Sequence, residues 1–173
     1  ANIVDMNIVP NVRDAFGLES DVNEDGKIAV VITPVLNYMT QFSDDEDSLG
    51  TLVGSYADPE VDLNERTKEN ENSNEQEVIF AFAPDPYGFY HIYPQTTSEE
   101  YVDVEILAQI SQSLYRLISY NQHVVVEESD MEETWVREGL SLLAMDLAGF
   151  GAVNHSVAWD YLDATHLHAL TSV

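Results

Sequence analysis

The stretch QISQSLYRLISYNQ, residues 109–122, decides the fold class expected for this chain. Polar and apolar residues in and around it form two separate stripes at helical spacing: Glu105, Gln109, Gln112 and Arg116 on one, and Leu107, Ile110, Leu114, Leu117 and Ile118 on the other. Because residues three and four apart share one face of a helix, the pattern predicts a long amphipathic helix from about Val102. Its apolar face requires a core to pack against.

A second long helix is predicted from about Glu132 to Leu147. Its apolar residues recur at helical spacing, which predicts that they are buried together: Val136, Leu140, Leu143 and Leu147. Gly149 and Gly151 follow, and glycine is common just past the end of a helix. A last short helix is predicted over Ser156 to Leu162, and another near the start over Val9 to Gly17, with Pro10 in its first turn.

The strands are expected before the two long helices. Lys27 to Thr33 (KIAVVIT) is β-branched and nearly all apolar, which favours a buried central strand that Pro34 ends. Further strands are predicted in three segments: Gly50 to Tyr56, Val78 to Ala83 and Phe89 to Tyr93, the last two joined as a hairpin. Residues 41–47 and 57–77 are polar and predict surface loops. This order predicts one α+β domain over residues 1–173, with a mixed β-sheet packed against two long helices.

The net charge of the chain is strongly negative, which limits the kinds of molecule that it is expected to bind. The 173 residues include 32 acidic and 6 basic ones, for a formal net charge of −26. We therefore expect the chain to bind neither nucleic acid nor anionic membrane surfaces, because their negative charge would repel it. The longest apolar run, Ile28 to Leu36, is too short to span a bilayer, so no membrane insertion is expected. With two lysines in the chain, the acidity is typical of a protein in high salt or of a calcium-rich extracellular one.

The absence of cysteine limits the possible metal sites. Without thiols the chain forms neither disulfides nor thiolate sites, and any zinc would be held by histidine or carboxylates. His166 and His168 near the C-terminus, with Asp163 and Glu138, form the one cluster with ligand-like spacing. The remaining histidines, His91, His123 and His155, are scattered and are expected to be structural or exposed.

Four blocks of sequence resemble one family of enzymes. They are an acidic turn at 21–27 (DVNEDGK), a segment at 73–80 (SNEQEVIF), the helix end at 117–122 (LISYNQ) and residues 132–151 (EETWVREGLSLLAMDLAGFG). Together they resemble the gluzincin zinc metallopeptidases, and most closely the secreted hyicolysin family. The resemblance implies a zincin-like fold and an extracellular or cell-surface location. It also implies truncation, because active relatives continue past the second long helix with a further helical subdomain.

The catalytic motif of that family, HExxH, is not present in this chain. An ungapped alignment from residues 117–120 places the first zinc histidine at Gln112, the catalytic glutamate at Ser113 and the second zinc histidine at Arg116. Two histidine side chains four residues apart on a helix coordinate one zinc ion, and glutamine and arginine cannot replace them as ligands. Serine likewise cannot replace the glutamate that accepts the proton of the water. The resemblance thus implies a pseudopeptidase without zinc, whose catalytic positions are degenerate.

The third zinc ligand of the family is the glutamate of a W-x-x-E-G helix, which matches Glu138. A retained carboxylate without its metal is costly to bury, so we expect Arg116 to pair with Glu138 across the two helices. The alternative interpretation is an ordinary polar helix face opposite a solvated Glu138.

The acidic turn also copies part of a calcium-binding loop. Asp21, Asn23, Asp25 and Lys27 match positions 1, 3, 5 and 7 of an EF-hand, but position 12 is Ile32 rather than glutamate. Calcium binding would therefore require a ligand from elsewhere in the chain. The alternative, which the residues favour, is a turn rich in Asp and Asn with Gly26 in a left-handed conformation.

Three functions follow as expectations. The first is an inactive extracellular module that binds a protein or peptide partner in the old cleft, or that serves as a subunit of a larger surface assembly. The second is an active zinc enzyme whose metal site is displaced to His166, His168 and Glu138. The third is a calcium-binding surface protein.

Overall fold

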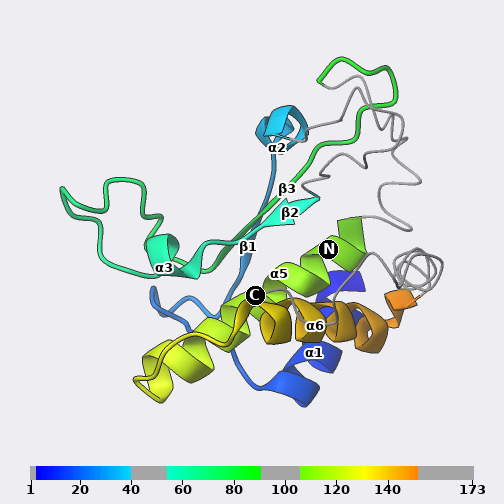
Figure 1. Cartoon of the computed structure of the whole chain (residues 1–173). Helices are drawn as coiled ribbons and strands as arrows, with labels where there is room; N and C mark the ends of the chain where they lie inside the picture. The colour runs from blue at the N-terminus through cyan, green and yellow to red at the C-terminus, as the bar shows by residue number, and fades with distance from the viewer. Residues whose placement is uncertain (1–2, 40–53, 91–105, 152–173) are drawn as a thin grey trace, which may run out of the picture.

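The computed structural model describes residues 3–39, 54–90 and 106–151, which form a small mixed β-sheet with helices packed against it (Figure 1). The elements before the long helices are η1 (Val4–Ile8), α1 (Val9–Phe16), β1 (Ala29–Ile32), α2 (Pro34–Met39), β2 (Ser55–Tyr56), α3 (Pro59–Asp62) and β3 (Val78–Ala81). They are followed by α5 (Ile106–Tyr120), η3 (Asn121–Val126), α6 (Thr134–Met145) and η4 (Asp146–Phe150). The expected α+β class is confirmed.

The sheet contains three strands in the order β1-β3-β2. β1 is parallel to β3, with Ala29 opposite Val78, whereas β2 is antiparallel to β3, with Ser55 opposite Ala81. The prediction of a buried central strand at 27–33 is wrong, because β1 is an edge strand among those described. Val30, Val31 and Ile32 are 38%, 39% and 57% exposed, and β3 is the buried central strand. An apolar run predicts a strand but does not fix its place in the sheet.

The other predicted strands are only partly described. The segment predicted at 50–56 contributes β2, and residues 50–53 lie outside the described ranges. Phe89 and Tyr90 form a bend rather than the start of a hairpin strand, and residues 91–93 also lie outside the described ranges. The carboxylate of Asp85 fixes this bend by accepting hydrogen bonds from the backbone N–H groups of Phe89 (2.7 Å) and Tyr90 (2.9 Å).

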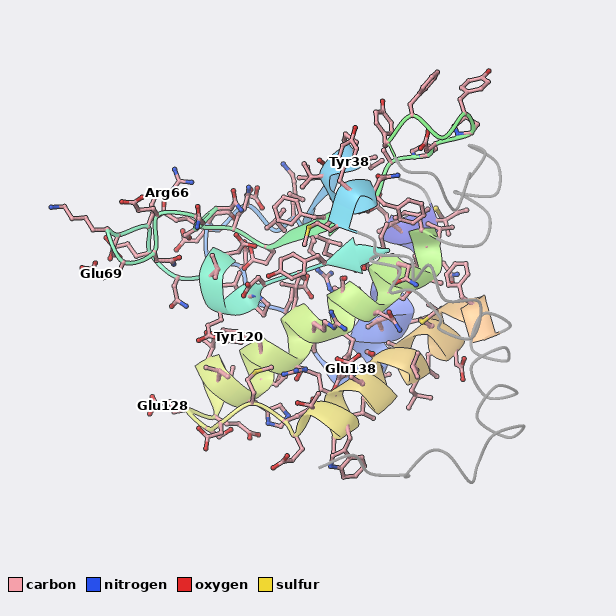
Figure 2. All side chains as sticks on the ribbon, turned by 45° about the horizontal axis from the view of Figure 1, so that its top comes forward. Tyr38, Arg66, Glu69, Tyr120, Glu128 and Glu138 are labelled. Carbon is pink, nitrogen blue, oxygen red and sulfur yellow. The ribbon has the colours of Figure 1, made fainter. Side chains whose placement is uncertain are left out.

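The polar segment 57–77 is more ordered than the predicted surface loop. It contains α3, whose first turn is capped by Asp58 through the backbone N–H of Val61. Asp62 and Ser73 are buried, and the Asp62 carboxylate accepts a hydrogen bond from the Asn74 amide at 2.6 Å. The tip of the segment, with Arg66 and Glu69, projects away from the helices (Figure 2). Hydrogen bonds rather than apolar packing hold its base.

Helix α5 lies at the centre of the fold and contacts most other elements. Its predicted apolar stripe is buried, as are Ser113 and Tyr115, while Gln109, Gln112 and Arg116 are half-buried. The Tyr115 ring meets Phe16 of α1 edge-on, with 4.8 Å between ring centroids. The predicted N-terminal helix is also confirmed as α1, which ends at Gly17 with φ 98°. In the described ranges, no helix combines the length and the apolar character needed to cross a bilayer.

Helix α6 packs on α5, but not with the face that its leucines predict. Leu143 and Leu147 are each 43% exposed, and Val136 and Leu140 are half-buried, so the predicted burial of all four is wrong. The buried residues are instead Ser141, Ala144, Met145 and Ala148. Small side chains allow two helices to approach closely, which explains why this stripe faces α5. Gly149, with φ 93°, follows shortly after, as predicted.

Candidate functional site

Arg116 of α5 and Glu138 of α6 form the salt bridge that the sequence predicts. The Nη2 atom of Arg116 lies 3.2 Å from Oε1 and 3.1 Å from Oε2 of Glu138. The Arg116 and Glu138 side chains are 29% and 47% exposed, so the pair contributes about 1 kcal/mol or less to stability. The buried Nε of Arg116 has no hydrogen-bond partner among the described residues. Glu138 is thus paired with Arg116 while it also remains partly solvated, as the alternative interpretation expects.

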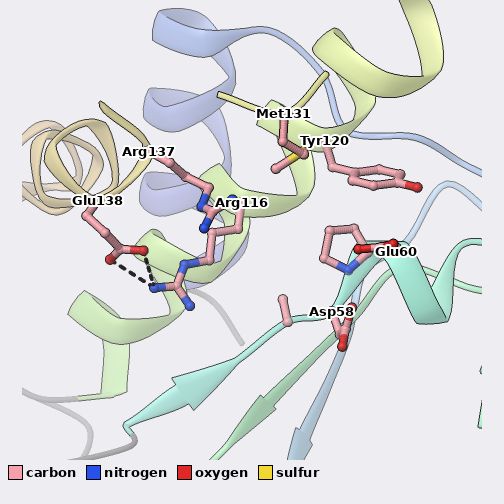
Figure 3. A pocket seen from close by; sticks show the side chains of 9 residues that line it. Asp58, Glu60, Arg116, Tyr120, Met131, Arg137 and Glu138 are labelled. Carbon is pink, nitrogen blue, oxygen red and sulfur yellow. Dashed lines mark hydrogen bonds and ion pairs between the residues drawn. The ribbon is translucent and has the colours of Figure 1, made fainter. Parts of the chain in front are cut away.

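The salt bridge lines an open pocket of about 230 Å³. Arg116, Arg137 and Glu138 approach it from the two long helices, while Asp58 approaches it from the N-cap of α3 and Glu60 from the first turn of α3 (Figure 3). The pocket thus contains two of the six basic residues in the chain. No carboxylate in the part of the chain that the structure describes lies within salt-bridge distance of Arg137. Arg137 can therefore meet an anionic group of a ligand.

The other two positions that the resemblance aligns with the catalytic motif differ from each other in burial. Gln112 is half-buried, one helical turn before Arg116. Ser113 is fully buried and lies 2.5 Å from the hydroxyl of Ser55 in β2, which in turn donates to the backbone carbonyl of Gln109 at 2.7 Å. Because the Ser55 hydroxyl donates its one hydrogen to the carbonyl of Gln109, the Ser113 hydroxyl is the donor to the Ser55 oxygen. Ser113 thus ties α5 to β2 and does not line the pocket.

A buried polar cluster beside α5 was missed by the sequence analysis. The Glu132 carboxylate accepts hydrogen bonds from Tyr115 (2.5 Å) and Ser119 (2.8 Å), and it lies 3.2 Å from Nε2 of His123. The spacing of four residues from Tyr115 to Ser119 to His123 could have placed these three on one helical face. Nothing in the pattern pointed to Glu132, which precedes α6. His123 is half-buried, and its other ring nitrogen lies 3.8 Å from Glu127.

The cluster shifts the pKa values of its members in opposite directions. Burial of Glu132 favours its neutral form, but hydrogen bonds from Tyr115 and Ser119 and the nearby His123 outweigh burial, so the pKa of Glu132 is lowered. Burial raises the pKa of Tyr115, and its bond to Glu132 raises that pKa further. At neutral pH, Glu132 is thus an ionised acceptor and Tyr115 a neutral donor.

We expect Glu132→Gln to cost about 2 kcal/mol of unfolding free energy at pH 7, because hydrogen bonds to a charged acceptor are lost. A lowered folded-state pKa contributes stability that is present above the unfolded value of about 4.3 and is lost as the pH falls through the folded value. The difference between wild type and variant should therefore shrink between about pH 5 and pH 2 in urea unfolding. Glu133→Gln, an exposed neighbour with the same charge change, is the control. A difference that stays constant with pH would contradict this role of Glu132.

The residues of the predicted calcium loop lie together in an exposed turn. Their side chains accept hydrogen bonds from the backbone of the turn itself: Asp21 from Gly26 at 3.0 Å, Asn23 from Asp25 at 3.2 Å, and Asp25 from Lys27 at 2.8 Å. Ile32, at position 12, lies in β1 and is exposed. Among residues 3–39, 54–90 and 106–151, no three acidic or histidine side chains are arranged ready to hold a metal ion. Asp163, His166, His168, His91 and His155 lie outside the described residues.

The geometry therefore brings together Arg116 and Glu138, adds Arg137, Asp58 and Glu60 to the same pocket, and separates Ser113 from it. These five residues are the candidate binding site. In comparisons with protein-family models, with curated proteins and with solved structures, no match to this chain was found.

Proposed function

We propose that this protein is a catalytically inactive, zincin-like module that binds an extended peptide or a protein segment outside the cell. The observation that carries the proposal is the Arg116–Glu138 salt bridge in an open pocket between the two long helices and the sheet. The guanidinium lies where the resemblance to gluzincins would place a zinc ion, opposite the carboxylate that would be its third ligand. The positively charged side chain of Arg116 thus pairs with the carboxylate of Glu138 in place of a metal ion.

The edge of the sheet provides a second part of the proposed binding surface. Among the described strands, β2 has one neighbour, β3, and no described strand pairs with its other edge. Residues 57–60, which follow β2 directly, line the pocket. A peptide that added to this edge would form backbone hydrogen bonds along it and would project side chains toward the pocket. An acidic side chain or a C-terminal carboxylate would then meet Arg137.

Catalysis is not supported by the residues at the positions where the resemblance would place the zinc ligands and the general base. Gln112 and Arg116 cannot hold zinc as imidazoles do, and Ser113 is too buried and too weakly basic to activate water. A displaced zinc site at His166, His168 and Glu138 would have to break the salt bridge between Arg116 and Glu138. Stoichiometric zinc together with peptide hydrolysis that a chelator blocks would establish that alternative and overturn ours.

An assembly role is the second candidate, and a different surface favours it. Val31 and Ile32 of β1 and Val35, Tyr38 and Met39 of α2 are all exposed. Contiguous apolar side chains on a sheet edge and the helix after it are typical of surfaces that contact other protein chains. Light scattering across a concentration series separates the two candidates, since a subunit of a homomeric assembly increases in mass and a monomeric peptide binder does not.

We expect Arg137→Gln to weaken peptide binding at least about tenfold, or about 1.4 kcal/mol, because it removes a cation of the pocket that has no described acidic partner. Peptides would be selected from a random nonapeptide library on the immobilised wild-type protein. The affinity of a selected acidic peptide would then be measured by fluorescence anisotropy. Lys68→Gln makes the same charge change at an exposed residue between Arg66 and Glu69, which mark the tip that projects away from the helices (Figure 2), and should leave binding unchanged. Equal losses in both variants, or no selected peptide, would contradict the proposal.

A further inference from the structure

Glu77 is the most unusual buried group outside the pocket. It directly precedes β3, and the residue is 1% exposed. Its Oε1 accepts hydrogen bonds from the Ser20 hydroxyl at 2.6 Å and from the Val22 backbone N–H at 3.0 Å. Its Oε2 is buried and has no hydrogen-bond partner among the described residues. A buried carboxylate is normally paired with a cation or bound to a metal, because removing its charge from water is costly.

No basic side chain in the described ranges neutralises Glu77. Arg13 is engaged by Glu19, and Lys27 is exposed. The carboxylate instead contacts both chain neighbours of Asp21, the first residue of the EF-hand-like turn. Its two oxygens are separated by one carbon atom, so the unpartnered oxygen also lies beside that turn. The orphaned buried oxygen thus belongs to a carboxylate that is hydrogen-bonded to the start of the turn, although Asp21, Asp25 and Glu77 are not arranged to hold a metal ion as they stand.

The turn lacks one calcium ligand, and Glu77 is of the type that is missing. An EF-hand uses side-chain oxygens at positions 1, 3 and 5, a backbone carbonyl at position 7 and a bidentate glutamate at position 12. Here Asp21, Asn23, Asp25 and the carbonyl of Lys27 match the first four, and Gly26 at position 6 has the positive φ of 67° that the sharp turn requires. Position 12 is in β1, whose residues are committed to the sheet.

We infer that this turn and Glu77 together form a calcium site, in which Glu77 supplies across the fold the carboxylate that Ile32 cannot. Five protein groups then face one ion, and Asp21, Asp25 and Glu77 provide three negative charges for it. Water completes the six to eight oxygen ligands that calcium takes. In the absence of the ion, the Asp21, Asn23 and Asp25 side chains accept hydrogen bonds from the backbone of the turn. Binding turns their free oxygens toward the ion and gives Oε2 of Glu77 a partner.

The site joins the starts of two paired strands. The backbone N–H of Ala29, the first residue of β1, donates to the carbonyl of Glu77 at 2.8 Å, and Ala29 pairs with Val78 of β3. A calcium ion held by the turn before β1 and by the residue before β3 would brace this parallel pair. Parallel strands are joined by no tight turn, so a bridging ion adds a connection that the chain itself does not provide.

Thermal unfolding with and without calcium chloride tests the inference. With a Kd near 10⁻⁴ M, as in extracellular modules, 10 mM calcium should raise the Tm of the wild type by about 5 to 10 °C. Magnesium chloride at the same concentration should raise it much less, because the flexible, oxygen-rich site suits the larger ion. Titration calorimetry with calcium chloride alone should give one site per chain.

Substitutions at single residues identify which side chains bind the calcium ion. Glu77→Gln should lose the calcium-dependent rise in Tm, measured against its own calcium-free value, and so should Asp25→Ala, which removes the side-chain oxygen of an exposed residue. Glu24→Gln, at position 4 of the same turn, makes the same charge change at a non-ligand position and should keep the full rise. The inference is overturned by a wild type without a rise, by a Glu77→Gln variant that retains it, or by equal rises with magnesium and calcium. If Glu77→Gln does not fold, a full rise in Asp25→Ala overturns it as well.

Discussion

The double variant Gln112→His/Arg116→His is expected to bind one zinc ion per chain, with a Kd of about 10⁻⁶ M or tighter, equal to about −8 kcal/mol. Positions 112 and 116 share one face of α5, and Nη2 of Arg116 already lies 3.1 Å from Glu138. Imidazole is shorter than an arginine side chain, and a zinc–nitrogen bond of about 2.0–2.1 Å makes up part of the difference. The ion would thus lie near the present position of the guanidinium, with Glu138 as its third ligand.

The measurement is zinc content after dialysis, followed by competition with a chromogenic chelator. Gln112→His/Arg116→Ala is the matched control, since it removes the same cation but adds one imidazole fewer, and it should bind at least about tenfold more weakly. The wild type should bind no stoichiometric zinc at this site. Equal binding by both variants would show that positions 112, 116 and 138 do not form one metal site, and the resemblance to gluzincins would lose its main structural support.

Peptide hydrolysis is not expected even in the zinc-loaded double variant. Ser113 remains at the position that the resemblance assigns to the general base, and its hydroxyl is buried against Ser55. A glutamate at position 113 would have to displace this contact between α5 and β2. The contact between Ser113 and Ser55 is thus compatible with the proposed binding role of the pocket.

Helical periodicity predicted the two long helices because the face of a helix that packs on the core carries apolar residues at a regular spacing in the sequence. Leu114, Leu117 and Ile118 of α5 are buried as their spacing indicates. The same reasoning failed for α6, where Leu143 is exposed while Ala144 and Met145 are buried. Close packing against α5 favours small residues there, and a scale that weighs side chains by hydrophobicity undervalues Ala144 and Ala148.

Contacts between segments far apart in sequence were mostly beyond prediction. The strand β1 has the composition of a buried strand but lies at the edge of the described sheet. The place of a strand in a sheet depends on which other segments pair with it, and its own composition does not determine this. Glu77 and Glu132 each complete a polar cluster from a distant segment, and neither has a local signal. The salt bridge between Arg116 and Glu138 was predicted from the resemblance, which suggested that a cation at position 116 would face the carboxylate of Glu138.

Met145→Ala should lower the free energy of unfolding by about 2 to 5 kcal/mol, whereas Leu143→Ala should lower it by no more than about 1 kcal/mol. Met145 is 1% exposed and faces the core, so its truncation leaves a cavity that the surrounding helices fill only in part. Leu143, two residues earlier in α6, is 43% exposed and leaves no cavity. Urea unfolding followed by circular dichroism gives both values, provided that the slope with denaturant is the same in all three proteins. If Leu143→Ala were the more damaging change, α6 would pack with its leucine face as the sequence predicts. That rotation would also carry Arg137 and Glu138 around the helix axis, and the salt bridge to Arg116 could not form as described.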